Sequence, residues 1–130
     1  MNRNKLRLFL AITTICCVMT TGLSYASQIN VQDLLNGNTA FGKKLKWGLS
    51  ISVLFGSDGQ IIVVDERGNT EKGTWWVNGS GDLCTKFARE SCRKVSRSSS
   101  GAYQVHNETN DKLVDWSLAE IAKGNPYGIK

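Results

Sequence analysis

The stretch from Gly73 to Val95 constrains the fold of this chain more than any other part of the sequence. Its aromatic and β-branched residues alternate with polar ones, and residues 78–82 supply the glycines, asparagine and aspartate that a tight reversal needs. This pattern predicts three short strands, with Cys84 on the second and Cys92 on the third. The chain is therefore expected to build an antiparallel sheet around this stretch.

Cys84 and Cys92 are expected to form a structural disulfide. They are eight positions apart, and an even separation across a hairpin requires a loop with an odd number of residues, either 87–89 or 86–90. An oxidising compartment favours a bridge between such thiols. Neither a Cys-x-x-Cys motif nor a suitably spaced histidine accompanies them, so a redox or metal role has little support.

The N-terminal segment has the pattern of a secretory signal. Three basic residues precede an apolar core at residues 8–18, and small residues that signal peptidase reads end at Ala26. We expect cleavage after Ala26, which removes residues 1–26 and leaves one domain at residues 27–130 without a transmembrane segment. The apolar core is shorter than the roughly 20 residues that span a bilayer. A periplasmic or secreted location follows from this reading.

Cys16 and Cys17 raise the alternative of a lipid anchor on the mature chain. Ile15 stands before Cys16, where a lipoprotein signal has a small residue, and another cysteine precedes Cys17. We therefore assign both cysteines to the apolar core of the cleaved signal.

The charge balance argues against nucleic acid as a partner. The full sequence carries a formal net charge of +5, but the signal segment contains three basic residues and no acidic ones. The exported chain is therefore closer to neutral than the whole sequence and lacks a general electrostatic attraction for nucleic acid.

A short helix is expected before the first strand. Asn30 can cap it, Asp33 lies in its first turn, and Gly37 can take the left-handed position that closes it. Its apolar stripe consists of Val31, Leu34 and Leu35. Such a short helix is stable only when packed, so we expect it to lie across one end of the sheet.

Alternation then continues nearly to the C-terminus. Trp47 to Phe55 has an apolar residue at every second position, which predicts a half-buried strand. Counting residues 39–45 as the first strand and residues 103–107 and 112–118 as a final hairpin, the chain has about eight short strands. We predict a mainly β fold: a small antiparallel barrel, a lipocalin-like or calycin-like meander, with a short N-terminal helix.

The tryptophans suggest a ligand-binding interior. Trp75 and Trp76 are adjacent, so on a strand they must point to opposite faces. One indole either faces a barrel mouth or exposed patch that holds an apolar ligand, or is simply covered by the N-terminal helix. For the ligand-binding alternative, the candidate lining residues are Trp47, Ile51, Trp75 and Tyr103.

A cluster of cations surrounds the cysteine hairpin. Such a patch suits anionic lipid head groups, acidic polysaccharide or an acidic partner protein, whereas the alternative is a solvated edge protected against strand addition. The candidate basic patch consists of Lys86, Arg89, Arg93, Lys94 and Arg97.

No catalytic constellation is recognisable in the sequence. His106 is the only histidine, and strand alternation directs it away from Tyr103 and Val105, toward solvent. There is no Gly-x-Ser-x-Gly elbow, and no cysteine is left as a nucleophile. The candidate carboxylates for an acid-base pair fall in or near expected turns and strand ends: Asp65, Glu66, Glu71 and Asp115. We therefore expect a protein that is not an enzyme and has no cofactor or metal.

The order of several short motifs resembles a family of small secreted or periplasmic bacterial proteins of unknown function. The motifs are Leu35-Asn36-Gly37-Asn38-Thr39, Ser57-Asp58-Gly59, Gly73-Thr74-Trp75, Leu83-Cys84, Cys92 and Gly124-Asn125-Pro126-Tyr127-Gly128. The resemblance covers most of the exported chain. It implies a bacterial envelope or secreted location and a β-rich fold, and it implies no activity, cofactor or catalytic residue. Family members tend to have a glycine-rich bend between the two cysteines, where this chain has Phe87-Ala88-Arg89-Glu90.

Two functions remain as hypotheses. The first is a secreted or periplasmic binding module that engages a small apolar or amphiphilic ligand through its aromatic residues. The alternative is a protein-interaction factor, such as an enzyme inhibitor or secreted effector, that meets an envelope or host protein through the basic hairpin.

Overall fold

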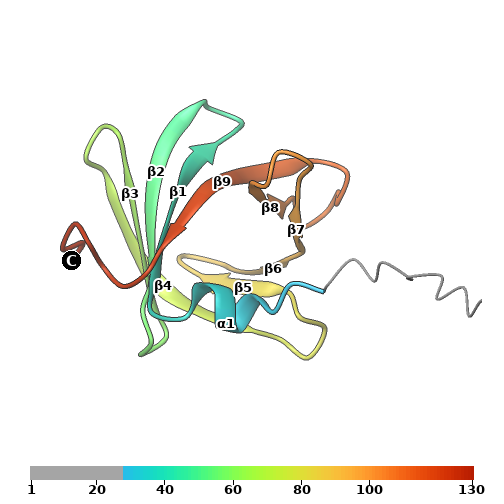
Figure 1. Cartoon of the computed structure of the whole chain (residues 1–130), viewed down its shortest axis with the longest axis horizontal. Coiled ribbons are helices and arrows are strands. Elements are labelled where there is room, and N and C mark those ends of the chain that lie inside the picture. The colour runs from blue at the N-terminus through green and yellow to red at the C-terminus, as the bar shows by residue number, and fades with distance from the viewer. Residues whose placement is uncertain (1–27) are drawn as a thin grey trace, which may run out of the picture.

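The computed structural model describes residues 28–130, and the expected signal at residues 1–26 lies outside them. Within this part, one short helix, α1 (Val31–Leu35), precedes nine strands (Figure 1). The strands are β1 (Asn38–Lys44), β2 (Leu49–Phe55), β3 (Gln60–Asp65), β4 (Thr70–Val77), β5 (Leu83–Lys86), β6 (Glu90–Arg93), β7 (Val95–Arg97), β8 (Tyr103–His106) and β9 (Val114–Ala122).

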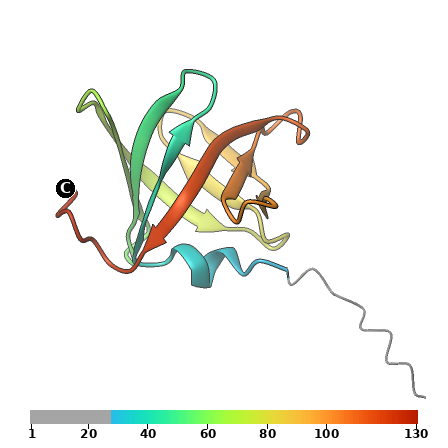
Figure 2. The same cartoon turned by 45° about the horizontal axis from the view of Figure 1, so that its top comes forward.

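All nine strands belong to one antiparallel sheet, in the order β6-β5-β4-β3-β2-β1-β9-β8-β7. Strands β1 to β6 follow one another as a meander, and β9 lies on the free side of β1, where it leads on to β8 and β7. The sheet curls into a nearly closed barrel (Figure 2). The predicted antiparallel barrel with a short N-terminal helix is confirmed.

The barrel closes at a bend in residues 90–97. The first half of this segment, β6, pairs with β5 at one edge of the sheet, and the second half, β7, pairs with β8 at the other edge. Lys94 alone separates the two halves, and its carbonyl accepts a hydrogen bond of 2.9 Å from the His106 amide. Because the two halves take different partners, the structure has nine strands where the turn signals predicted about eight.

The helix forms as its end signals predicted. The Asn30 side chain accepts a hydrogen bond of 3.1 Å from the Asp33 amide, and Gly37 has a φ of 74°. Val31 and Leu35 are buried and join the hydrophobic core. The helix lies below the barrel in Figure 1, at the end from which β1 starts. It therefore plugs that end with apolar side chains.

The core fills the barrel next to this helix. It includes inward-facing residues of β2 and β3, and Phe55 packs edge to face on Trp75 with ring centroids 5.3 Å apart. The Trp75 indole Nε1 donates a hydrogen bond of 2.9 Å to the Gly56 carbonyl, which satisfies its one polar atom. The fully formed core therefore leaves no role for Trp75 in an open site.

Trp75 and Trp76 point to opposite faces of β4, as expected. Trp76 is half-buried and lies opposite Cys84 in the β4–β5 pairing, on the outer face of the barrel. The helix packs into the interior cluster that contains Trp75 and not onto this outer position. Of the two adjacent indoles, Trp75 is therefore the one that shares a buried cluster with the helix, and Trp76 lies outside that cluster.

The predicted disulfide between Cys84 and Cys92 is present. The two residues are direct partners in the β5–β6 pairing, and residues 87–89 form the three-residue loop between the strands. Of the two predicted loops, residues 87–89 and residues 86–90, the structure has the shorter one. The bridge joins neighbouring strands of the barrel next to its point of closure.

Candidate ligand-binding mouth

The end of the barrel opposite α1 is open and contains a cleft of about 560 Å³. Ligand pockets typically enclose roughly 300 to 1,000 Å³, so this volume suits a small organic molecule. The cleft, which we call the mouth, is lined by Lys44, Lys46, Trp47, Glu71, Leu83, Thr85, Phe87, Ala88, Arg89, Ser91, Arg93, Val105, Asn107, Asp115 and Trp116.

The floor of the mouth is apolar. Leu83 and Val105 are each only 1% exposed and belong to the core cluster, while Trp116 packs against that cluster and is half-buried. These residues come from β5, β8 and β9, whose alternation directs every second side chain inward. A ligand in the mouth would meet the top of the hydrophobic core.

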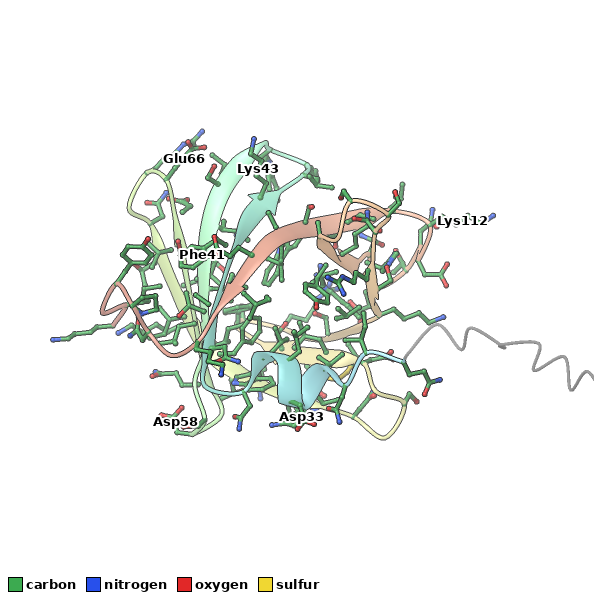
Figure 3. All side chains as sticks on the ribbon, viewed as in Figure 1. Asp33, Phe41, Lys43, Asp58, Glu66 and Lys112 are labelled. Atoms are coloured by element: carbon green, nitrogen blue, oxygen red, sulfur yellow. A yellow bond between two sulfur atoms is a disulfide. The ribbon has the colours of Figure 1, made fainter. Side chains whose placement is uncertain are left out.

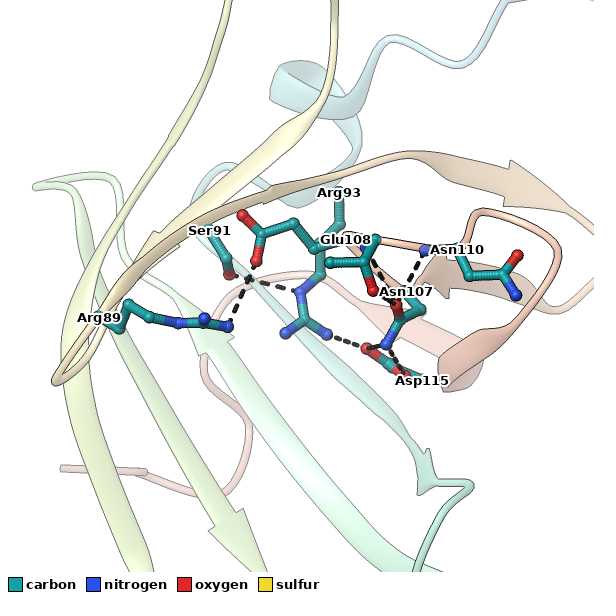
Figure 4. A network of polar contacts seen from close by, with 8 residues as sticks. Arg89, Ser91, Arg93, Asn107, Glu108, Asn110 and Asp115 are labelled. Atoms are coloured by element: carbon teal, nitrogen blue, oxygen red, sulfur yellow. Dashed lines mark hydrogen bonds and ion pairs between the residues drawn. The ribbon is translucent and has the colours of Figure 1, made fainter.

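One wall of the mouth is an ion pair between Arg93 and Asp115 (Figure 4). The side chains are 24% and 27% exposed, so the pair is partly shielded from water. Asn107 Nδ2 donates to both carboxylate oxygens of Asp115, at 3.3 and 3.4 Å, and Arg93 Nε lies 3.4 Å from Ser91 Oγ. The pair is thus held in place from both sides.

A β-bulge aims Asp115 into the mouth. In the β8–β9 pairing Val105 lies opposite Trp116 and His106 lies opposite Val114, which leaves Asp115 without a partner residue. An extra residue of this kind bends its strand and redirects its side chain. The bulge places the carboxylate where it meets Arg93, which comes from a strand not adjacent to β9.

A second ion pair crosses the mouth. Lys44 Nζ lies 3.6 Å from Glu71 Oε1, although β2 and β3 separate their strands in the sheet. Lys44 is 18% exposed and follows Ala40 and Gly42 on the inward face of β1, whereas Glu71 is 57% exposed. The aliphatic part of the Lys44 side chain therefore crosses the barrel interior, and its ammonium group lies at the mouth.

The rim carries aromatic and cationic side chains. The Lys46 ammonium lies 5.1 Å from the Trp47 ring centroid, and Arg89 forms an exposed ion pair of 3.4 Å with Glu108. Phe87 folds back onto Gly73, where an added Cβ would lie 2.9 Å from the phenyl ring and 2.2 Å from a main-chain oxygen. This glycine lets the β5–β6 loop close against the barrel.

The four predicted lining residues do not share a cavity. Ile51 and Trp75 lie in the filled core. Trp47 is on the rim of the mouth, 64% exposed, because β2 begins only at Leu49 and the tryptophan belongs to the preceding turn. Tyr103 lies in a different groove, beneath the Arg97 guanidinium at 5.3 Å. Of the four, Trp47 alone reaches the mouth.

The five predicted basic residues also separate. Arg93 turns into the mouth, while Lys94, the next residue, points away from it and contacts Asp111 at 3.3 Å. Arg89 and Lys94 each pair with a carboxylate of the segment that joins β8 to β9, whereas Arg93 pairs with Asp115 near the start of β9. Lys86 and Arg97 are exposed elsewhere, at the end of β5 and the end of β7. The five cations therefore do not form one patch.

His106 is half-buried and forms two hydrogen bonds of 2.6 Å, one between Nδ1 and the Asp111 carbonyl and one between Nε2 and the Ser96 hydroxyl. A carbonyl can only accept, so in the neutral ring Nδ1 carries the proton and Nε2 accepts from the serine hydroxyl. The side chain points away from the core as predicted, but the loop after β8 folds over it. The imidazole thereby ties β7 to that loop.

Most of the polar residues of the mouth were not predicted from the sequence. Glu71 and Asp115 were expected only at turns and strand ends, and Lys44, Asn107 and Trp116 were not assigned to a site. The inward alternation of Lys44 with Ala40 was a usable signal. Nothing local marks Asp115 as a partner of Arg93, because the bulge and the closure of the barrel bring them together.

Among residues 28–130 there is no cluster of three or more His, Cys, Asp or Glu side chains suited to a metal ion. In the same part of the chain, no helix has the length and hydrophobicity to cross a membrane. The sequence matches no protein-family model and no curated protein sequence.

Proposed function

We propose that this chain is an exported binding protein whose mouth holds a small amphiphile with an acidic head group. The observation that carries the proposal is an apolar floor directly below a mainly cationic opening. Four cations line the cleft, Lys44, Lys46, Arg89 and Arg93, against two carboxylates, Glu71 and Asp115. Export rests on the N-terminal signal pattern.

The floor supports binding of the apolar part of the ligand. Trp116 and Phe87 are only half-buried and border the cleft beside the buried side chain of Leu83. Covering such surface releases water at roughly 25 cal/mol per Å² of apolar area. An alkyl chain or aromatic ring in the cleft would complete the burial of these side chains.

The wall supports binding of the acidic part. Arg93 presents planar N–H donors, which suit bidentate contacts with a carboxylate or phosphate. Its present partner is Asp115, and Asn107 also bonds that carboxylate. The carboxylate of a ligand can therefore bind the Arg93 guanidinium together with Asp115, while Asn107 continues to donate hydrogen bonds to Asp115.

The test uses fluorescent displacement. The exported protein is titrated with anilinonaphthalene sulfonate, which combines an aromatic body with an anionic group, and the dye is then competed with decanoate, decanol or decylamine. We expect decanoate to displace the dye best and decylamine worst. Equal displacement by all three compounds, or no dye binding at all, contradicts the proposal.

Matched variants locate the site. Trp47→Ala removes an indole from the rim and Tyr127→Ala removes a phenol that is 76% exposed outside the mouth, so neither change reaches the core. We expect weaker decanoate binding for Trp47→Ala and unchanged binding for Tyr127→Ala. The pair Arg93→Gln with Asp115→Asn keeps the shape of the wall without its charges, and we expect it to abolish the preference for decanoate over decanol.

The alternative is a protein-interaction factor, such as an inhibitor of a host or rival enzyme. Its support is weaker, because the five basic residues do not form one patch: Arg93 faces the mouth, whereas Lys86 and Arg97 lie at the ends of β5 and β7. Native mass spectrometry of protein purified from the envelope or medium of its own host separates the two proposals. A bound small molecule supports the first, and a bound protein supports the second.

A further inference from the structure

Three of the four strongly exposed large hydrophobic residues in the described part of the chain lie in segments next to the mouth. Four large hydrophobic residues are strongly exposed in residues 28–130: Leu45 at 46%, Trp47 at 64%, Leu113 at 56% and Tyr127 at 76%. Leu45 and Trp47 lie in the turn between β1 and β2, and Leu113 immediately precedes β9. Three of the four therefore lie in two segments that border one end of the barrel.

These two segments are adjacent in space. The Leu45 amide donates a hydrogen bond of 2.8 Å to the Asp115 carbonyl, and Lys44 lies opposite Trp116 in the β1–β9 pairing. The hydrogen bonds between β1 and β9 thus extend to the turn that carries Leu45 and Trp47, close to the segment that carries Leu113. Together Leu45, Trp47 and Leu113 form an apolar tip beside the mouth.

Three lysines lie in these segments or next to them: Lys46 in the β1–β2 turn, Lys112 directly before Leu113, and Lys43 near the end of β1. Lys43, Lys46 and Lys112 are all exposed, and none of them forms an ion pair with another residue of the described part of the chain. In Figure 3 the Lys43 side chain extends upward beside the β1–β2 hairpin, and the Lys112 side chain extends to the right from the loop before β9. The carboxylates of Glu108 and Asp111 are engaged by Arg89 and Lys94. Near Lys43, Glu66 accepts a hydrogen bond from the amide of Ser50, the residue opposite Lys43 in the β1–β2 pairing.

We infer that the apolar tip and its lysines dock the protein onto an anionic lipid surface. Exposed apolar residues on loop ends, flanked by lysine, are suited to the boundary between head groups and acyl chains, where tryptophan is also favoured. Lysines attract negatively charged lipid at short range. A turn and a loop end can enter such a boundary without exposing unpaired strand edges to it. The inference extends the proposed function, since docking would place the mouth against a source of amphiphiles.

Vesicle binding tests this inference. The exported protein is sedimented with vesicles of phosphatidylcholine containing about one third phosphatidylglycerol, and with vesicles of phosphatidylcholine alone. We expect binding to the anionic vesicles only, a blue shift of tryptophan emission, and loss of binding in high salt because salt screens the lysines. Absence of binding to the anionic vesicles, or equal binding to both, overturns the inference.

Variants outside the mouth keep this test separate from the ligand test. Leu113 and Lys112 border the mouth without lining it. We expect Leu113→Ser with Lys112→Glu to weaken vesicle binding about tenfold. Each basic residue near the membrane surface and each apolar group inserted into it contributes to the free energy of binding. Tyr127→Ala is the control and should bind as the wild type does. Undiminished binding of the double variant overturns the inference.

Decanoate binding without vesicles is measured on the same proteins. The double variant should keep decanoate binding, because its changes lie outside the cleft. If vesicle binding fails while decanoate still binds, the docking surface is wrong and the ligand proposal stands. If vesicles bind and decanoate does not, the ligand proposal is wrong and the docking surface stands.

Discussion

Arg93 and Asp115 form an ion pair between segments 22 positions apart in the sequence that share no strand pairing. Arg93 lies at the end of β6, the strand whose outer edge has no partner in the sheet, and Asp115 is the bulged residue of β9. The pair thus spans the opening that remains where the barrel closes. The ion pair therefore forms one wall of the mouth and also connects β6 to β9 across this opening.

Removing one partner of this pair should destabilise the barrel. Asp115→Ala leaves the guanidinium of Arg93 partly shielded and without its carboxylate, and we expect a loss of about 1–3 kcal/mol in unfolding free energy. Urea denaturation measures this loss. Arg89→Ala breaks an ion pair whose arginine is 82% exposed and should cost no more than about 0.5 kcal/mol. Equal losses for the two variants would contradict the role given to Arg93.

Gly42 should tolerate no side chain. A Cβ there would lie 1.9 Å from the Ser117 carbonyl oxygen, at the register shift between β1 and β9. We expect Gly42→Ala to lower stability by about 2–3 kcal/mol, because main-chain atoms of Ser117 and Leu118 in β9 must move. Gly79→Ala is the matched control, with no atom within 4 Å of the added Cβ, and it should change stability by less than about 0.5 kcal/mol. Thermal unfolding of both variants checks the difference.

The disulfide should contribute measurably to stability. Cys84→Ser with Cys92→Ser opens a loop between residues separated by eight positions, and we expect a loss of about 2–3 kcal/mol from the greater freedom of the unfolded chain. Urea denaturation of oxidised and reduced wild type provides the internal comparison. If reduction leaves the denaturation midpoint unchanged, the bridge contributes nothing and this expectation is wrong.

Asp65 should titrate at unusually low pH. Slight desolvation alone would raise the pKa of its carboxyl, but hydrogen bonds from Asn69 and Arg67 outweigh this effect and hold the pKa below its usual value. The carboxylate's contribution to stability is then complete above the ordinary aspartate pKa of about 3.9 and is lost as pH falls through the lower, folded pKa. A proton NMR titration of the Asn69 amide reports the transition. A midpoint at or above the ordinary value would refute it.

Local signals predicted the elements that local contacts stabilise. Asn30 and Gly37 mark the two ends of α1 because a side-chain cap and a left-handed glycine act within a few residues. The spacing of Cys84 and Cys92 likewise fixed the parity of their hairpin loop, since strand partners must face each other. Alternation indicated β2 correctly from Leu49 onward but placed Trp47 on the strand. Hydrophobicity alone does not show where a turn begins.

The candidate site depended on contacts that no local pattern describes. Strand alternation could place Arg93 on the inward face, yet its partner Asp115 reaches the mouth only because β9 is bulged. Similarly, Lys44 and Glu71 meet across a barrel whose curvature is set by the whole sheet. The predicted lining residues Ile51 and Trp75 were assigned to a cavity that the side chains of α1 and Phe55 fill.

By itself, the sequence determined that this chain would form short antiparallel strands, one capped helix and a cystine hairpin, because alternation, caps and parity act over a few residues. Only the tertiary structure decided which end of the barrel is filled and which is open. That choice depends on the bend at Lys94, which sends one segment from β5 to β8, and on the packing of Val31 and Leu35 into the opposite end. Both are consequences of closing the sheet, and closure is a property of all nine strands together.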